Sequence, residues 1–241
     1  MLTDQRNQGL TRMLFICGVV AGPLFIAAAL VQDYTRAGFD PRIDPLSLLS
    51  LGDWGWVQIL NFSITGLLNI AFAVGLWRRL HPGGKGIWSS LLIGAYGVGL
   101  VGGGIFQDDP AYGFPPGATT PPQLSWHGIL HDVAGTLVFM SLAAALFVFV
   151  RYFQVRGEGL WSWYCLLSGF LLLVFFFFGT SLGEAFEARF LRLGVLFGWG
   201  AASAIAMHFL ASDSARVHDN SAVKRPVQGA QRVPTVPTKA G

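Results

Sequence analysis

The stretch that decides the fold is GILHDVAGTLVFMSLAAALFVFV, residues 128–150, in which His131 and Asp132 are the only ionisable side chains. An α-helix needs about 20 mainly apolar residues to cross the ~30 Å hydrocarbon layer of a bilayer. This stretch has that length, and it lacks the short alternating pattern of a membrane β-strand. It therefore predicts a helix that spans a membrane.

Five further runs of similar length and composition occur along the chain. They are Met13–Val31, Trp56–Trp77, Ile87–Phe106, Leu160–Leu182 and Phe190–Leu210. Charged residues make up only 12% of the 241 residues, about half the fraction in soluble domains. The sequence thus predicts an all-α polytopic membrane protein, a bundle of six transmembrane helices within residues 13–211. Residues 1–12 are expected to form a cytoplasmic N-terminus, and the polar residues 212–241 a disordered cytoplasmic tail.

The basic residues are distributed unevenly between the two sides of this bundle. Twelve of the 16 lie before the first helix, in the second and fourth connections, or in the tail: Arg6, Arg12, Arg78, Arg79, Lys85, Arg151, Arg156, Arg216, Lys224, Arg225, Arg232 and Lys239. Because basic residues accumulate on the cytoplasmic side, both termini are predicted to be cytoplasmic. We expect a multi-pass protein of the inner or plasma membrane whose partners are membrane lipids and not nucleic acid.

The second predicted helix carries a polar stripe. Its members are Gln58, Asn61, Thr65 and Asn69, which are three or four residues apart and therefore share one helical face. Exposure of amides to lipid would be costly, so the stripe is expected to face the bundle interior. Hydrogen bonding between helices is one role for it, and a polar pocket or pathway that includes Gln58 and Asn61 is the other.

Ionisable side chains gather where the predicted helices meet the outer face. They are Asp108 and Asp109 after the third helix, His127, His131 and Asp132 at the start of the fourth, and Glu187 and Arg189 before the sixth. Consecutive helices are usually antiparallel neighbours, so these segments are expected to meet at one membrane face. We expect Asp109, His127, His131 and Asp132 to line one pocket, with Asp108, Glu187 and Arg189 beside them.

The spacing of the two histidines is compatible with a metal ion. His127 and His131 are four residues apart and so project from one face of a helix. Together with the Asp109 carboxylate they would provide three ligands for zinc, with water as the fourth. Asp132 would then act as the catalytic base on the bound water. The alternatives are polar packing without a metal, or a path for protons or ions.

Several motifs resemble those of an uncharacterised prokaryotic membrane family catalogued as domain of unknown function 998. They are IDPLSLLSLGDWGWVQILNFSITGLL (43–68), GIFQDDP (104–110), WHGILHDVAG (126–135) and GEAFEARF (183–190). The resemblance implies a bundle of six or seven helices and assigns no activity. It marks Ser47, Asn61, Asp109, His127, His131, Asp132, Glu187 and Arg189 as motif positions, with Arg192 as an alternative to Arg189.

These observations define an integral membrane protein of unknown biochemical function with a polar pocket at its outer face. A metal-dependent membrane hydrolase acting on a lipid or an amide is one function that would use this pocket. A small-solute or proton-coupled transporter is an alternative that would use the polar stripe together with Asp132. A non-catalytic lipid-binding or assembly protein is the third.

Overall fold

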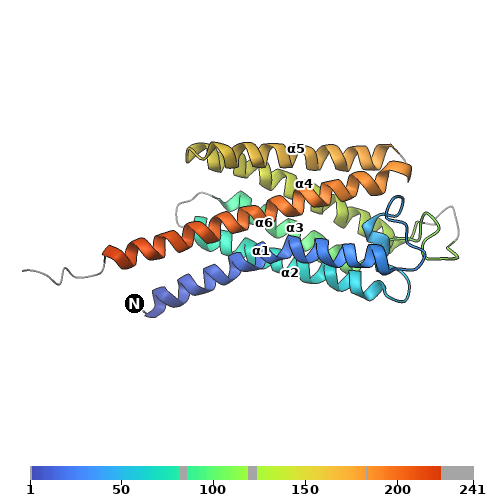
Figure 1. Ribbon diagram of the computed structural model, residues 1–241, viewed down its shortest axis with the longest axis horizontal. Coiled ribbons are helices and arrows are strands. Elements are labelled where there is room, and N and C mark those ends of the chain that lie inside the picture. Colours follow the sequence, from blue (N-terminus) through green and yellow to red (C-terminus); the bar gives the residue numbers. More distant parts are fainter. Residues whose placement is uncertain (1, 82–85, 119–123, 183, 224–241) are drawn as a thin grey trace, which may run out of the picture.

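The computed structural model of this protein describes residues 2–81, 86–118, 124–182 and 184–223. Within these ranges every long element is an α-helix (Figure 1). The elements are α1 (Leu2–Thr35), the short 3₁₀-helix η1 (Leu46–Ser50), α2 (Gly55–Leu80), α3 (Ile87–Ile105), α4 (Trp126–Val155), α5 (Gly159–Ser181) and α6 (Glu184–Val223). Six of these helices are long and apolar enough to cross a membrane, which confirms the predicted fold class.

The first and last helices extend beyond the predicted helical domain. Helix α1 begins at Leu2, inside the segment 1–12 that was predicted to precede it. Helix α6 continues to Val223, so residues 212–223 are helical where a disordered tail was predicted. Hydropathy marks only the part of a helix that crosses hydrocarbon, whereas an existing helix gains a hydrogen bond for each residue added beyond it. The rest of the predicted tail, 224–241, lies outside the described residues.

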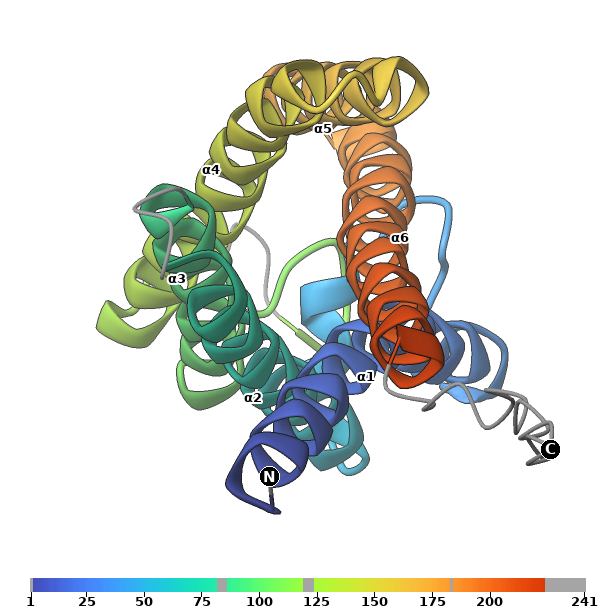
Figure 2. The same cartoon turned by 90° about the vertical axis from the view of Figure 1, so that its left-hand side faces the viewer.

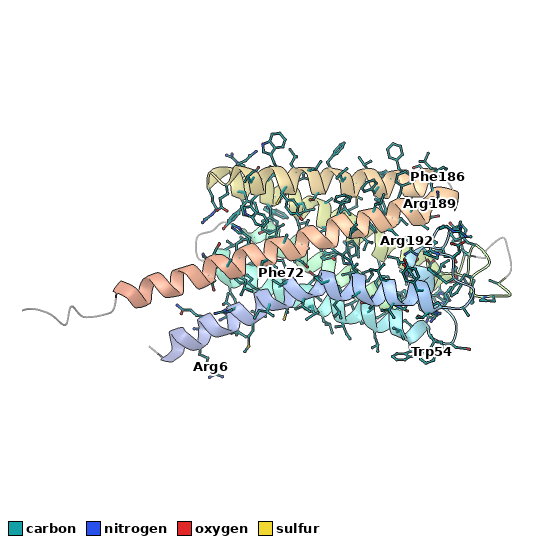
Figure 3. All side chains as sticks on the ribbon, viewed as in Figure 1. Arg6, Trp54, Phe72, Phe186, Arg189 and Arg192 are labelled. Atoms are coloured by element: carbon teal, nitrogen blue, oxygen red, sulfur yellow. The ribbon has the colours of Figure 1, made fainter. Side chains whose placement is uncertain are left out.

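The six helices stand in a ring (Figure 2). Each helix packs against its neighbours in the sequence, and α1 packs against α6 to close the ring. The start of α1 and the end of α6 lie at one end of the bundle, which we call the terminal end (Figure 1). Residues 36–54 and 106–118 lie at the opposite end and form what we call the cap; Arg6 and Trp54 mark the two ends in Figure 3.

Aromatic side chains fill the half of the ring nearest the terminal end. Phe72 of α2 is fully buried, and its ring centroid lies 6.2 Å from that of Phe15 of α1. Phe15 contacts Phe209 of α6 at 5.7 Å, and Phe209 contacts Phe149 of α4 at 6.1 Å. Four helices therefore meet through these rings.

Small residues set the distance between α2 and α3. A Cβ atom added to Gly66 would lie 2.6 Å from the carbonyl oxygen of Gly97, and one added to Gly97 would lie 2.7 Å from that of Gly66. Both distances are shorter than any real Cβ contact, so the two backbones touch directly. In a membrane such close approach stabilises helix pairs through dispersion and backbone contacts.

Helices α1 and α6 are joined through a serine hydroxyl. Pro23 lies inside α1, and because proline lacks an N–H it interrupts the hydrogen-bond ladder of that helix. The Ser203 hydroxyl of α6 accepts a hydrogen bond from the Gly22 amide (3.1 Å) and donates one to the Gly18 carbonyl (3.0 Å). These two backbone groups are normally partners within one helix. Ser203 therefore provides hydrogen bonds to the turn of α1 that precedes Pro23.

The polar stripe of α2 faces the interior, as predicted. Gln58, Asn61, Thr65 and Asn69 are each at most 5% exposed. The Gln58 carbonyl oxygen accepts hydrogen bonds from Gln32 of α1 (2.8 Å) and from Asn61 (3.1 Å). The Asn61 amide also donates to the backbone carbonyl of Phe25 in α1 (3.1 Å). Two members of the stripe thus join α1 to α2.

Candidate functional site

A cavity of about 410 Å³ lies inside the ring, in the half nearest the cap. Each helix contributes an apolar side chain to its wall: Phe25, Phe62, Leu100, Val138, Phe176 and Trp199. Polar groups border it toward the cap: Ser47, Asp108, Tyr112, His131, Asp132 and Glu187. The cavity is therefore amphipathic, with an apolar inner part and a polar outer part.

His131 lies two turns into α4 and is 7% exposed. Its Nδ1 atom lies 2.7 Å from the carbonyl oxygen of Phe106, at the end of α3. A carbonyl only accepts hydrogen bonds, so Nδ1 carries a proton, and Nε2 of the neutral ring keeps its lone pair. Nε2 lies 4.0 Å from the Oδ2 atom of Asp108, a gap that suits one bridging hydroxyl or water.

The cap fixes the position of Asp108. The Ser47 hydroxyl of η1 donates to its Oδ2 atom (2.6 Å), and the Asp109 amide donates to Oδ1 (2.8 Å). The Gln107 side chain also donates to the Ser50 carbonyl (3.1 Å). The two cap segments thus hold the carboxylate as a hydrogen-bond acceptor, directed toward His131.

The remaining polar groups of the cavity come from the cap, α4, α6 and, through Thr180, α5. Tyr112 of the cap donates a hydrogen bond to Glu187 of α6. Tyr112 itself has a positive φ of 55°, a conformation uncommon for a residue other than glycine. Asp132 and Thr136, one turn apart on α4, are exposed side chains on the wall. The polar rim therefore contains three carboxylates and one imidazole.

The cap has an apolar centre of its own. Phe39, Leu48, Leu49, Leu51 and Phe114 form a buried cluster, and the rings of Phe39 and Phe114 meet edge to face at 5.3 Å. Arg36 donates to the Leu51 carbonyl and lies 5.7 Å from the centre of the Phe114 ring. The two cap segments are therefore one packed unit, so Ser47 and Asp108 keep fixed positions.

Arg192 attaches this cap to the helix ring. Its Nη1 atom lies 2.6 Å from the Oδ2 atom of Asp33 in α1, and Nη2 donates to the Asp44 carbonyl (3.1 Å). Its guanidinium also lies 5.6 Å from the centre of the Phe39 ring. Burial raises the pKa of the Asp44 carboxyl, against the opposing hydrogen bond from the Asp40 amide. Arg192 and Arg189 both lie at the cap end in Figure 3, but Arg189 is exposed.

Asp109 and His127 belong to a separate network at the start of α4. The N-cap residue Ser125 donates to Asp109 through its amide (2.7 Å) and hydroxyl (2.6 Å), and the hydroxyl accepts from the Gly128 amide. Burial acts to raise the pKa of Asp109, but the two bonds from Ser125 outweigh it and the pKa is lowered. His127 Nδ1 lies 2.8 Å from the Ser125 hydroxyl and 3.1 Å from the Gln107 carbonyl. This network holds the loop to the helix.

The residues predicted as zinc ligands are thus divided between two places. His131 borders the cavity, whereas His127 and Asp109 are engaged at the helix start, with their closest atoms 3.9 Å apart. Among the residues that the structure describes, no group of three or more His, Cys, Asp and Glu side chains is arranged to hold a metal ion. Zinc binding remains a prediction, and the described geometry does not support this particular ligand set.

The other predicted pocket residues are divided as well. Asp108, Asp132 and Glu187 border the cavity. Gln58 and Asn61 hydrogen-bond to α1 and do not line it, and Arg189 faces outward.

Three residues of this region, Ser47, Tyr112 and Arg192, were not predicted as site residues from the sequence. Ser47 occurs in a family-like motif but was not predicted as a site residue. No sequence pattern indicates Tyr112, because its contact with Glu187 depends on how its loop folds back onto α6. Arg192 was named only as an alternative to Arg189. Its position next to Asp33 arises from the contact between the first and last helices.

Comparison with known proteins adds one positive finding. The family described as "Protein of unknown function (DUF998)" matches residues 19–212. No curated protein and no solved structure matches the chain.

Proposed function

Since the chain belongs to the DUF998 family of proteins of unknown function, we propose a function from its cavity: the protein binds a lipid-like amphiphile at the outer leaflet. The observation that carries this proposal is the amphipathic character of the cavity. A volume of about 410 Å³ lies in the range of small-molecule sites, about 300–1,000 Å³. If both termini are cytoplasmic, as the basic residues predict, the cap faces outward and the apolar part lies within the membrane.

The polar rim limits the kind of headgroup that fits. Asp108, Asp132 and Glu187 provide carboxylates, and the neutral form of His131 adds an acceptor at Nε2, so acceptors outnumber donors. No arginine or lysine lines the described cavity, and a phosphate would meet negative charge there. The rim favours a headgroup rich in hydroxyl or ammonium donors, with its apolar chain among Phe62, Leu100 and Trp199.

Hydrolysis of the bound headgroup is a second candidate, favoured by one specific observation. In its neutral form His131 has a lone pair on Nε2, 4.0 Å from the fixed carboxylate of Asp108. A water molecule donating to both would transfer a proton to His131 as its oxygen attacks an ester or amide carbonyl of the ligand. The Phe106 carbonyl would stabilise the resulting imidazolium through the Nδ1 proton. As the tetrahedral intermediate collapses, the bond from the carbonyl carbon to the leaving oxygen or nitrogen breaks, and the His131 imidazolium returns the proton to that leaving atom. Transport is less favoured, because Gln58 and Asn61 do not line the cavity.

The experiment is to extract and identify lipids that remain bound to the full chain after purification in a neutral detergent. Gly135 lines the cavity, and a Cβ atom there would meet no atom within 4 Å. Gly135→Leu should therefore fill the cavity and greatly reduce the bound lipid without distorting the helix. Gly200→Leu is the matched control, because Gly200 also has open space but does not line the cavity.

An equal lipid yield from the Gly135 variant and the parent would refute binding in this cavity. The hydrolysis candidate is tested next, by incubating the identified lipid with the parent and with His131→Gln. That variant should still bind the lipid but lose turnover. Turnover in the variant equal to that of the parent would exclude His131 as the base and leave the binding proposal intact.

A further inference from the structure

A second cavity, of about 580 Å³, lies at the terminal end, between α1, α2 and α6. It differs in chemistry from the cavity under the cap, because its wall carries basic and amide groups. These are Asn7, Gln8, Arg78, Arg79 and His81, beside the Thr11 hydroxyl and one carboxylate, Asp213. The two cavities thus lie at opposite ends of the bundle and present opposite charge.

Arg78 is held in place by side chains of α1. Its Nε atom donates to the Thr11 hydroxyl (3.3 Å), and Nη2 donates to the Asn7 side-chain carbonyl (3.2 Å). Among the described residues no carboxylate lies within ion-pairing distance of Arg78. A guanidinium has five N–H donors, so several remain for another acceptor. Within the described part of the chain, neutral groups hold Arg78 in a fixed orientation, and its charge has no partner there.

The neighbouring cation is only partly balanced. Arg79 pairs with Asp213 of α6 through Nε and Oδ1 at 3.2 Å. Two guanidinium groups thus face one carboxylate, which leaves a net positive charge, and His81 adds to it when protonated. The side-chain NH₂ groups of Asn7 and Gln8 add neutral donors. This combination matches the several oxygen acceptors of a phosphate, which arginine binds in a bidentate manner.

An aromatic residue places this cavity near the membrane surface. Trp77 lines it, is 40% exposed, and stacks on His81 with ring centroids 4.2 Å apart. Tryptophans at the ends of membrane helices lie at the level of the lipid headgroups. Basic cavities between helices on the cytoplasmic side are where anionic headgroups bind.

We propose that this cavity binds the phosphate headgroup of an anionic phospholipid. Arg78 and Arg79 contact the phosphate, Asn7 and Gln8 donate to the headgroup, and the acyl chains extend along the outside of α1 and α2 beside Trp77. A free phosphate has the same acceptors but lacks the chains that would pack against the exposed apolar surface. The site is independent of the cavity under the cap.

The test measures the melting temperature of the full chain in a neutral detergent as phosphatidylglycerol, phosphatidylcholine or inorganic phosphate is added. Phosphatidylglycerol should raise it, and the other two should not. Arg78→Gln should raise the phosphatidylglycerol concentration needed for the same rise about fivefold, since one arginine near an anionic surface contributes about 1 kcal/mol. Arg151→Gln is the matched control, because Arg151 is an exposed arginine of α4 that does not line the cavity; it should keep the full effect.

A second variant covers the case in which Arg78→Gln does not fold. Gln8 is exposed on α1, and Gln8→Glu adds a negative charge to the cavity without removing a described hydrogen bond. It should also lose the effect of phosphatidylglycerol. The proposal is overturned if these variants respond like the parent, or if phosphatidylcholine acts equally well. A full response to inorganic phosphate would overturn the assignment to a lipid.

Discussion

Arg192→Met is expected to lower the free energy of unfolding by about 3 kcal/mol. The variant keeps an apolar chain of similar length but removes the charge that faces Asp33, whose side chain is only 5% exposed. A buried charge that loses its partner destabilises a fold by about 3–5 kcal/mol. Among the described residues, Asp33 Oδ1 and Arg192 Nε have no hydrogen-bond partner. The pair is thus incompletely satisfied in the parent, and we expect the lower end of that range.

The measurement is unfolding of the full chain by SDS in mixed micelles, followed by tryptophan fluorescence. The pair formed by Arg42 and Asp40 is the matched control, because its atoms lie at a similar distance, 2.7 Å, but the arginine is 76% exposed. Exposed pairs contribute little, so Arg42→Met should unfold like the parent. Combining Arg192→Met with Asp33→Asn should restore part of the lost stability, because no orphaned charge remains.

Two results would refute this reasoning. One is an Arg192→Met variant as stable as Arg42→Met, which would mean that the buried pair contributes nothing. The other is strict additivity of the changes at Arg192 and Asp33, because directly interacting residues give non-additive effects.

Four further predictions concern other parts of the molecule. Ser203→Ala should lower the free energy of unfolding by about 1 kcal/mol, as for other hydrogen bonds between membrane helices, in the same SDS titration; no change would contradict the bridging role. The lowered pKa of Asp109 means that its stabilisation is complete above the unfolded value, near pH 4, and is lost as the pH falls through the folded value. The melting temperatures of the parent and Asp109→Asn should therefore converge below pH 4, and a constant difference from pH 7 to pH 3 would contradict this. Dialysis against EDTA should leave lipid binding unchanged; a loss that zinc reverses would show that a metal site exists after all. Alkaline phosphatase fused to the C-terminus should be inactive in cells, and activity would invert the predicted orientation.

The helices were predictable because each depends on a property that is local in the sequence. A run of apolar residues as long as 128–150 has to span the bilayer wherever it packs. The burial of Gln58 and Asn61 follows from periodicity and from the cost of placing amides in lipid. The extent of α6 beyond residue 211 was not predictable in this way, because hydropathy does not report a helix that continues past its apolar run.

The site was less predictable because it depends on where loops lie. His127 and His131 share a helical face by spacing, yet only His131 borders the cavity. The N-cap Ser125 and the Gln107 carbonyl engage His127 in the first turn, and spacing alone does not reveal this. Ser47 reaches Asp108 across 61 residues, a contact that no periodicity indicates.

The closure of the ring by α1 and α6 determines the order in which this protein is assembled. Ser203 bonds to Gly22 and Gly18, which precede it by 181 and 185 residues in the chain. The other main helix–helix contacts join consecutive helices. Non-local contacts form late, and membrane helices emerge from the ribosome in sequence. Until α6 is synthesised, Asp33 lacks Arg192, and the cavity under the cap lacks one of its walls. If the cavity binds an amphiphile as proposed, binding is the last property that the nascent chain acquires, and a chain that stops before α6 lacks it.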